Sequence, residues 1–299
     1  SLWHRMNVLS MFAGFKTFTH TSSRIRLIGV IARARSGDAA GDMCKAKTMP
    51  AMLLLGLVLG LLSPAASSQV YQIGHCLYGC PLGTDSSNHL LVRAIYALSY
   101  NTQTKSADWV AYEISAGSIG IASSLSRETI TDDYVAETLQ DADFAAAADS
   151  GLIRAQYVPL VGFAATPYWQ EVNYLTNAVA RSTSLSQGAW YGLDWAIRNL
   201  VNREDSVFVV AGPVYYPDQE PRQLPVSTSH RVPDAFFKVI VTPEGRSAAF
   251  LLEQDTPVHL HHCEQQSSVE DIEELTGLDL FPELSRPLEP TLHTVLGCF

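Results

Sequence analysis

Four stretches of the chain alternate apolar and polar side chains or are apolar throughout, and this pattern predicts β-strands. The first is ADWVAYEIS at 107–115. The other three, SVFVVAGPVYY (206–216), AFFKVIVTP (235–243) and SAAFLLEQDT (247–256), are separated by turns rich in Pro, Gly and Asp. We therefore predict that these three strands form an antiparallel meander within one sheet.

Apolar side chains follow a helical period in other parts of the chain. In residues 186–202 they recur at helical spacing, namely at Trp190, Leu193, Ile197, Leu200 and Val201. Further on, SSVEDIEELTG offers a capping box of Ser267 and Glu270, and Gly277 as a helix stop. The strands and helices mix without a βαβ rhythm. The sequence therefore predicts an α+β fold, with one domain over 69–299.

The stretch GLIRAQYVPLVG (151–162) predicts a further short buried strand that carries two polar side chains. Arg154 and Gln156 are two residues apart, so both point to the same face of such a strand. A guanidinium and an amide presented together on an apolar strand make this pair a candidate for chemistry.

Charge is spread unevenly along the 299 residues, of which 47% are hydrophobic. Residues 1–48 hold 8 of the 20 basic and 2 of the 30 acidic side chains. The remainder has 20 − 8 = 12 basic and 30 − 2 = 28 acidic side chains, a net charge of −16. A body of this charge repels polyanions at long range, so nucleic acid would need a local basic patch or a bound cation. By itself the charge favours a soluble exported protein.

The segment MCKAKTMPAMLLLGLVLGLLSPAASSQ predicts a secretion signal. Lys45 and Lys47 form its basic region, the apolar region runs over 52–62, and small residues follow at 63–68. The apolar region is too short to span a bilayer comfortably. We expect cleavage near Ala66–Ser68 and a secreted or periplasmic protein.

About forty residues precede this signal, although a signal peptide belongs at the start of a chain. We therefore expect 1–42 to be upstream read-through or a disordered basic segment, with the true start at Met43 or Met49. Residues 43–68 are then the signal peptide. The alternative is that FKTFTHTSSRIRLIGVIARARSG belongs to a basic transit segment.

Cysteine usage agrees with export. Cys44 falls in the signal region, which leaves Cys76, Cys80, Cys263 and Cys298. An even number of cysteines in an exported chain indicates two disulfides, and four cysteines allow three pairings. The economical pairing is local, with Cys76 bonded to Cys80 and Cys263 to Cys298.

A metal site is the alternative use of the third cysteine. The run HLHHC places His259, His261 and His262 directly before Cys263, and such a cluster could bind an adventitious ion. A disulfide with a nearby exposed histidine cluster is the interpretation that the spacing favours.

The middle of the chain gathers amides, a hydroxyl and a carboxylate around one predicted helix. Asn173 and Asn177 lie one turn apart, and Ser186 and Asp194 lie two turns apart about a quarter-turn round the axis. Such a group could hold a hydrated hard cation. The simpler interpretation makes Ser186 a helix N-cap and Asp194 a solvated position, and spacing alone favours it.

Long segments of the chain, in order, resemble the secreted DNA/RNA non-specific endonucleases of the Serratia nuclease type. They are CLYGCPLGTDSSNHLLVRAIYALSYNTQTKSADWVAYEI, NYLTNAVARSTSLSQGAW, VVAGPVYY, VPDAFFKVIVTPEGRSAAFLLEQDTP, VEDIEELTGLDLF and the final GCF. The resemblance implies a central antiparallel sheet flanked by helices, with a ββα-metal active-site motif. It also implies hydrolysis of phosphodiesters in DNA or RNA with Mg²⁺, and it supports both local disulfides.

Carried over residue by residue, the resemblance assigns five retained positions. Arg127 and Arg154 would offset charge on the reacting phosphate and bind substrate. Asn173 and Asn177 fall on the family's Asn-Tyr-Leu-x-Asn run, with a substrate-binding role for Asn173 and a catalytic role for Asn177. Asp194 falls on the helix carboxylate that orients the metal's waters, one methylene shorter than the family's usual Glu.

Four positions depart from the family pattern. In the Asp-Arg-Gly-His motif the Asp becomes Ile153, the Gly becomes Ala155, and the general-base His becomes Gln156. The Asn that binds the metal becomes Ser186. An amide cannot accept a proton near neutral pH, and loss of a general base costs about 10²–10⁴-fold in rate. A hydroxyl is also a poorer Mg²⁺ ligand than an amide carbonyl.

These departures predict a degenerate nuclease that keeps the fold and a phosphate-binding groove but has lost most or all cleavage. One alternative is an active metal-dependent nuclease with a rearranged site, in which Asp194 binds the metal and a metal-bound hydroxide replaces the His. The second is a non-enzymatic secreted binding module, which the net charge of −16 motivates.

Overall fold

The computed structural model describes residues 72–224, 226 and 230–299. These residues belong to one compact unit, Ser68–Phe299. The expected basic segment (1–42) and the expected signal peptide (43–68) lie outside the described residues. Among the described residues, no helix combines the length and hydrophobicity needed to cross a membrane.

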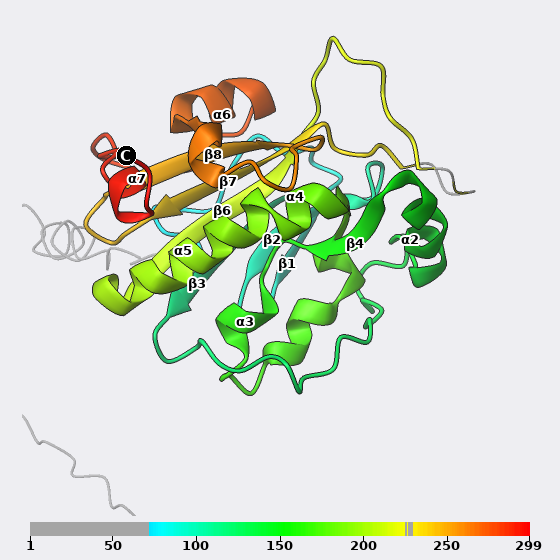
Figure 1. The fold of residues 1–299 in the computed structure, drawn as a ribbon, viewed down its shortest axis with the longest axis horizontal. Coiled ribbons are helices and arrows are strands. Elements are labelled where there is room, and N and C mark those ends of the chain that lie inside the picture. Colours follow the sequence, from blue (N-terminus) through cyan, green and yellow to red (C-terminus); the bar gives the residue numbers. More distant parts are fainter. Residues whose placement is uncertain (1–71, 225, 227–229) are drawn as a thin grey trace, which may run out of the picture. The chain divides into compact units, whose positions relative to one another are not determined.

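A seven-stranded antiparallel sheet forms the centre of the fold, in the order β1-β2-β3-β6-β7-β8-β9 (Figure 1). The strands are β1 (His89–Val92), β2 (Ala97–Asn101), β3 (Ser106–Ser115), β6 (Ser206–Val214), β7 (Ala235–Val241), β8 (Ser247–Glu253) and β9 (Gln266–Ser267). The predicted strands are all present, and β6, β7 and β8 form the predicted meander. In the turn between β7 and β8, Gly245 has φ of +90°, which glycine adopts without steric cost.

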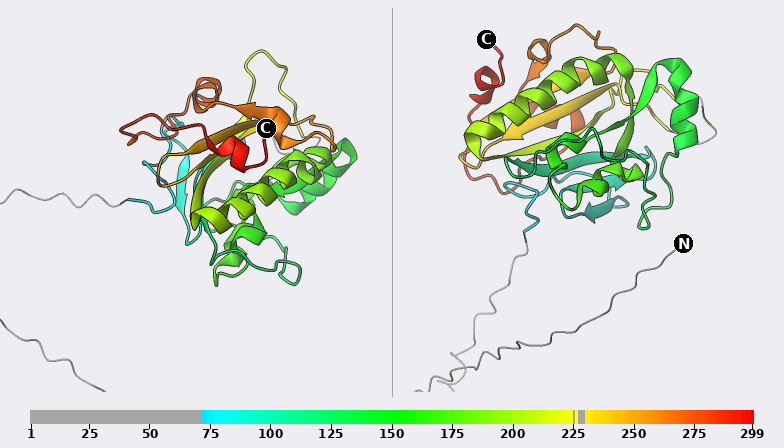
Figure 2. Two further views of the ribbon diagram at one scale, coloured as in Figure 1. Left: turned by 60° about the vertical axis from the view of Figure 1, so that its left-hand side comes forward. Right: turned by 60° about the horizontal axis from the view of Figure 1, so that its bottom comes forward.

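Side chains on both faces of the middle strands of this sheet are buried, because these strands alternate between two cores. Val110 and Tyr112 of β3 pack toward the α5 side, whereas Trp109 and Ala111 pack toward the α6 side. The same alternation places Phe236 of β7 in the first core and its neighbours in the second. The helices α5 and α6 consequently cover opposite faces of the sheet (Figure 2).

The helices that cover the sheet lie partly where the pattern predicted them. They are α2 (Asp141–Ala147), α3 (Leu160–Phe163), α4 (Thr183–Gln187), α5 (Ala189–Glu204), α6 (Val269–Thr276) and α7 (Leu292–Val295), with 3₁₀ turns η1 (Ala148–Ser150), η2 (Trp169–Asn173), η3 (Leu175–Asn177) and η4 (His262–Gln265). The predicted helix over 186–202 is divided at Gly188.

Two details of capping differ from the sequence-based interpretation. Ser186 is no N-cap, because it lies inside α4, whose N-cap is Ser182, and α5 starts after Gly188. The cap of α6 is shifted by one residue: Ser268 accepts a hydrogen bond from the Asp271 amide. Gly277 ends α6 in the left-handed conformation, as predicted.

A separate two-stranded sheet pairs β4 (Leu152–Gln156) with β5 (Ala178–Ser182). Its register sets Ile153 opposite Arg181 and Gln156 opposite Ala178. The chain passes from β5 through α4 directly into α5, which lies along the main sheet (Figure 1). This β4-β5-α5 unit has the ββα arrangement that the resemblance implied.

Both disulfides have the local pairing that the spacing favoured. Cys76 is bonded to Cys80, four residues away, and Cys263 to Cys298, 35 residues away. The second bond fastens the C-terminal segment to the η4 turn. Because its two cysteines are farther apart in sequence, it closes the larger loop and removes more chain entropy from the unfolded state.

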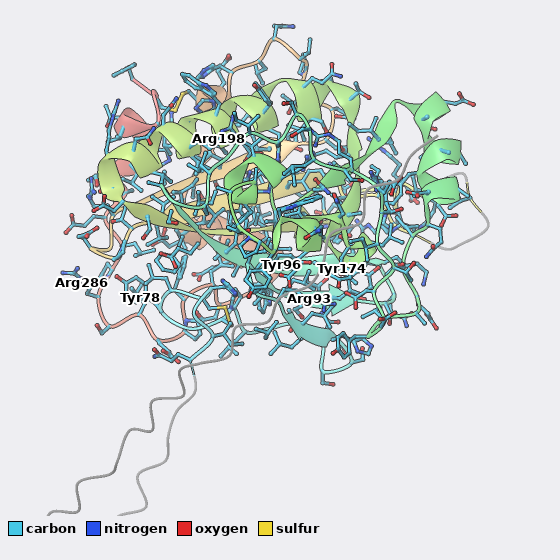
Figure 3. The ribbon with its side chains drawn as sticks, turned by 90° about the horizontal axis from the view of Figure 1, so that it is seen from below. Tyr78, Arg93, Tyr96, Tyr174, Arg198 and Arg286 are labelled. Atoms are coloured by element: carbon cyan, nitrogen blue, oxygen red, sulfur yellow. A yellow bond between two sulfur atoms is a disulfide. The ribbon has the colours of Figure 1, made fainter. Side chains whose placement is uncertain are left out.

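Arg93 fastens the loop before α2 against the first strands. Its guanidinium forms an ion pair of 2.6 Å with the buried Asp132, which also accepts a hydrogen bond from Thr176. The guanidinium carbon of Arg93 lies 4.3 Å from the ring centroid of Tyr174, and Tyr96 is close to Arg93 and Tyr174 (Figure 3). These contacts hold the loop that carries residues 126–132 close to the β4-β5 unit.

His230 is expected to make the folded state sensitive to acid. The ring is fully buried, and its Nδ1–H donates to the Thr104 carbonyl at 2.5 Å. Burial lowers the pKa of His230 from 6.5 to about 4. Because the folded pKa is the lower one, its stabilising contribution is complete above pH 6.5 and is lost as the pH falls through 4. The expected loss is on the order of 3 kcal/mol in the free energy of unfolding.

The His230→Asn variant isolates this contribution, since the Asn amide can donate to the same carbonyl without titrating. Urea unfolding of both proteins between pH 7 and pH 4 should show a smaller pH dependence for the variant. Parallel curves would assign the acid sensitivity to other groups.

Candidate functional site

A cavity of about 380 Å³ opens where β4, β5 and α5 meet the loop before α2. It brings together five of the residues that the sequence singled out, from four separate segments of the chain. The lining residues are Arg127, Ile153, Arg154, Ala155, Gln156, Pro159, Arg181, Ser186, Trp190, Tyr191 and Asp194.

Gln156 is held in place by its own amide group. Its Nε2 donates to the Val172 carbonyl at 2.9 Å and to Asn173 Oδ1 at 3.2 Å. Its backbone carbonyl, at the end of β4, faces the Arg181 guanidinium at 3.4 Å. An amide so bonded positions the loop of Asn173, and it offers no group that takes up a proton near neutral pH.

Arg154 on β4 and Arg127 in the loop before α2 are linked by a hydrogen bond. Arg154 donates to the backbone carbonyl of Arg127 at 2.8 Å, and its guanidinium lies 3.7 Å from the exposed Asp141 carboxylate. Arg127 itself is exposed. The ion pair between Arg154 and Asp141 is weak, because it is long and open to water. The guanidinium groups of Arg154 and of the exposed Arg127 therefore both stay available to an anion.

Asn173 and Asn177 lie behind the cavity and do not line it. Asn173 donates to the Ser126 carbonyl, one residue before Arg127. Asn177 is completely buried, accepts from the Val158 amide at 3.1 Å and donates to the Val172 carbonyl at 2.8 Å. Any role of these two amides in substrate binding or catalysis would thus be exercised through the backbone that they hold, and it stays a prediction.

Ser186 is bonded to a cation that the sequence analysis did not single out. Arg181, on β5, donates from Nε to Ser186 Oγ at 3.0 Å. Its guanidinium carbon lies 3.7 Å from the ring centroid of Trp190. Arg181 is only 4% exposed, yet it is within ion-pair distance of no carboxylate among the described residues.

Asp194 is engaged by a second buried cation. The Lys238 ammonium, on β7, donates to Asp194 Oδ1 at 2.5 Å and lies 3.7 Å from the Trp190 ring centroid. Burial lowers the pKa of Lys238 to about 8 and that of Arg181 to about 10, against the attraction of Asp194. Both side chains therefore carry a positive charge at neutral pH.

The sequence held a signal for these two cations. Arg181 follows AVA in a short apolar run, and Lys238 is a lone charge within AFFKVIV. A charge in a buried strand requires a partner, because an unpaired buried charge is costly. Asp194 was a candidate partner, but residue order does not show which strands pack against the helix that carries it.

Gly188 sets the direction in which α5 enters the site. A Cβ at this residue would lie 2.5 Å from the Val258 carbonyl oxygen, so a larger residue would push α4 and α5 away from that loop. The break at Gly188 directs Trp190 and Asp194 toward β5 and β7.

Comparison with known protein families identifies the family to which the chain belongs. The model of the DNA/RNA non-specific endonuclease family matches residues 76–286, which include the whole ββα unit and the cavity. The chain belongs to the DNA/RNA non-specific endonuclease family. It is 35% identical to a nuclease of Serratia marcescens over 256 residues, which cover 82% of this chain and 94% of that protein.

More distant relatives agree with this assignment. A nuclease of a Nostoc species is 24% identical over 74% of this chain and 85% of its own length. Among solved structures, a chain from a crystal structure of the EndoG/EndoGI complex superposes with a TM-score of 0.63 at 21% identity, over 74% of this chain and 95% of its own. That likeness shows that the fold is shared.

Members of this endonuclease family are generally metal-dependent, so the cavity can be tested for its fit to a divalent cation. A hydrated Mg²⁺ takes oxygen ligands, with carboxylates favoured. The cavity offers one carboxylate, Asp194, which is already bonded to Lys238. A cation held by Ser186 would lie beside the Arg181 guanidinium, which donates to Ser186 Oγ at 3.0 Å, and the double charge of Mg²⁺ would double the repulsion that a single charge meets there. The residues present do not fit a divalent cation.

The histidine cluster does not supply a replacement metal site. His261, His262 and Cys263 have ligand atoms within 4.8 Å of one another, but the Cys263 sulfur is bonded to Cys298. His262 is buried and faces the Leu296 carbonyl. The cluster therefore stabilises the C-terminal segment.

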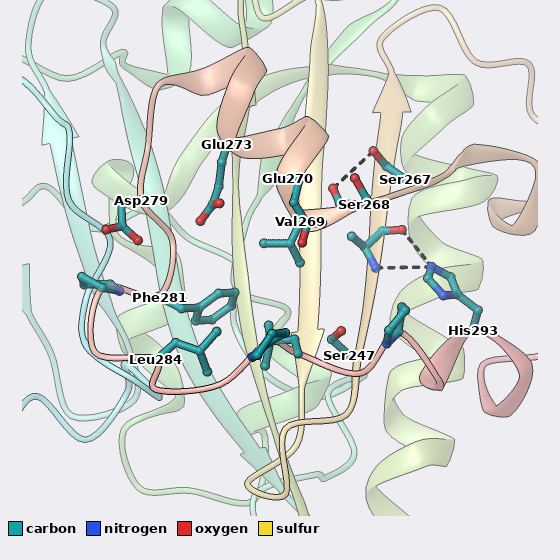
Figure 4. Close-up of a pocket in the computed structure, with 15 residues that line it drawn as sticks. Ser247, Ser267, Ser268, Val269, Glu270, Glu273, Asp279, Phe281, Leu284 and His293 are labelled. Atoms are coloured by element: carbon teal, nitrogen blue, oxygen red, sulfur yellow. Dashed lines mark hydrogen bonds between the residues drawn. The ribbon is translucent and has the colours of Figure 1, made fainter.

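A second cavity, of about 410 Å³, lies beside α6 and the C-terminal segment (Figure 4). Glu270, Glu273 and Asp279 line it, and burial raises the pKa of Glu273. Among the described residues that line it there is no lysine or arginine. This cavity repels phosphate, so the arginine-lined cavity is the candidate site for nucleic acid.

Proposed function

We propose that this member of the endonuclease family binds a phosphodiester of DNA or RNA in the arginine-lined cavity but cleaves it very slowly or not at all. The proposal rests on Gln156, which stands where the resemblance places the general base. Its side-chain Nε2 donates hydrogen bonds to the Val172 carbonyl and to Asn173 Oδ1. Among the described residues that line the cavity there is no histidine, so a base with a suitable pKa is missing from the cavity wall.

Binding is supported by the charges of the same cavity. Arg127, Arg154 and Arg181 line it, and the one lining carboxylate, Asp194, is neutralised by Lys238. The cavity is therefore a local basic patch on a chain whose residues 49–299 have a net charge of −16. Such a patch is what an acidic protein needs in order to bind a phosphate backbone.

The alternative of an active rearranged site receives less support. It requires Asp194 to bind a metal directly, whereas Asp194 Oδ1 accepts a hydrogen bond from Lys238 at 2.5 Å. Export from the cell is proposed on the expected signal peptide, and the two disulfides support it because such bonds persist in oxidising compartments.

The purified protein is expected to digest plasmid DNA and RNA at least about 10²-fold more slowly than the Serratia marcescens nuclease, which is the cost of losing a general base. The assay should include Mg²⁺, Mn²⁺ and Ca²⁺ from mildly acidic to alkaline pH. The Arg127→Ala/Arg154→Ala double variant, purified in parallel, controls for a contaminating nuclease. Rapid cleavage by the parent that this double variant abolishes would refute the loss of activity.

A further inference from the structure

Arg181 combines burial, charge and lack of an ion-pair partner in a way that calls for an anion. It is 4% exposed and it lines the cavity. Its hydrogen-bond acceptors are the neutral Ser186 hydroxyl and the Gln156 carbonyl, and its face lies on Trp190. Neutral acceptors stabilise a buried guanidinium only in part, and the carboxylate that attracts Arg181 from beyond ion-pair distance, Asp194, is itself bonded to Lys238.

Arg181 and Lys238 are bonded to the two residues that stand where the resemblance places the side chains that hold or orient the metal. Its Nε is bonded to Ser186, the residue that stands where the resemblance places the metal-binding Asn. Lys238 is bonded to Asp194, the residue that stands where the resemblance places the helix carboxylate that orients the metal's waters. Both of the side chains that would hold or orient a cation are thus bonded to cations that belong to the chain itself.

We propose that Arg181, with Lys238 neutralising Asp194, takes the place of the divalent cation in this protein, so that the cavity binds a phosphodiester without a metal. The planar fork of a guanidinium suits phosphate oxygens, and Arg127 and Arg154 line the same cavity. This inference rests on the proposed function for its ligand, and it adds that the binding needs no added ion.

Two measurements on the full-length protein test this. The first is a titration with MnCl₂, in which free Mn²⁺ is followed by electron paramagnetic resonance. The second is fluorescence anisotropy of a short fluorescein-labelled single-stranded DNA, in EDTA and in MgCl₂ at matched ionic strength. We expect no stoichiometric Mn²⁺ binding, and an affinity for the DNA that is the same within about twofold in the two buffers and weakens as salt rises.

The variant Arg181→Gln should weaken the binding of the DNA in EDTA by about tenfold, because it removes a buried cation from the cavity. The matched control is Arg203→Gln. Arg203 is exposed and lies nine residues beyond Asp194 on α5, about 13 Å along the helix, so it changes the net charge equally without touching the cavity. Its affinity should stay within about twofold of the parent.

Stoichiometric Mn²⁺ binding by the parent, or DNA binding that requires Mg²⁺, would overturn the replacement of the metal and leave the proposed phosphate binding intact. Equal losses in Arg181→Gln and Arg203→Gln would overturn the role of Arg181. Absence of DNA binding in both buffers at low salt would overturn the proposed function. The Mn²⁺ titration would then still decide whether the cavity holds a divalent cation.

Discussion

The triple variant Gln156→His/Ser186→Asn/Arg181→Gln is expected to cleave plasmid DNA in Mg²⁺ at least about 10²-fold faster than the parent. It restores a proton acceptor at the end of β4 and an amide oxygen in α4, and it removes the buried guanidinium that is hydrogen-bonded to residues 156 and 186. A general base by itself contributes about 10²–10⁴-fold. The Asp194–Lys238 pair that remains is neutral as a whole, so it does not repel a divalent ion in the way that Arg181 does.

The double variant Gln156→His/Ser186→Asn is the informative control, since it differs from the triple by Arg181 alone. We expect little gain in rate from the double variant, because the Arg181 guanidinium still bonds to the side chain at position 186. Comparable rates for the double and triple variants would show that Arg181 does not obstruct the site. An inactive triple variant that folds normally would place the loss of activity elsewhere in the cavity.

Asp194→Asn is expected to lower the free energy of unfolding by about 3–5 kcal/mol, the largest effect on stability expected from a single substitution in the site. Lys238 is completely buried, and Asp194 is its ion-pair partner at 2.5 Å. The substitution replaces the carboxylate by a neutral amide of nearly the same shape. It therefore leaves an uncompensated ammonium between β7 and α5. Urea unfolding at neutral pH measures the change.

A double-mutant cycle separates the pair from its surroundings. Lys238→Met removes the charge and keeps much of the buried aliphatic chain. The double variant Asp194→Asn/Lys238→Met should recover most of the loss caused by Asp194→Asn, because a buried ion pair can be replaced as a whole at little cost. Additive losses in the double variant would mean that the two side chains stabilise the fold independently.

Much of the architecture follows from local pattern. The strands of the meander were predictable because their apolar runs are interrupted by Pro, Gly and Asp turns that permit close antiparallel pairing. The local disulfides followed from cysteine spacing. The precise helix starts did not follow, because Ser182 and Ser268 compete with neighbouring serines for the capping position, and tertiary contacts such as that of Gly188 with Val258 select among them.

The site divides in the same way. The side chains of the site could be named from the residue order alone: a Gln where a base is expected, a Ser where an amide is expected, and arginines at 127 and 154. Which charges lie among these side chains became visible only in the folded chain. Lys238 comes from a strand that is distant in sequence, and the packing of β7 against α5 brings its charge to Asp194. Arg181 precedes Ser186 by only five residues, and the turn from β5 into α4 brings these two side chains together. Residue spacing describes one element at a time, whereas the electrostatics of a cavity is summed over every element that surrounds it.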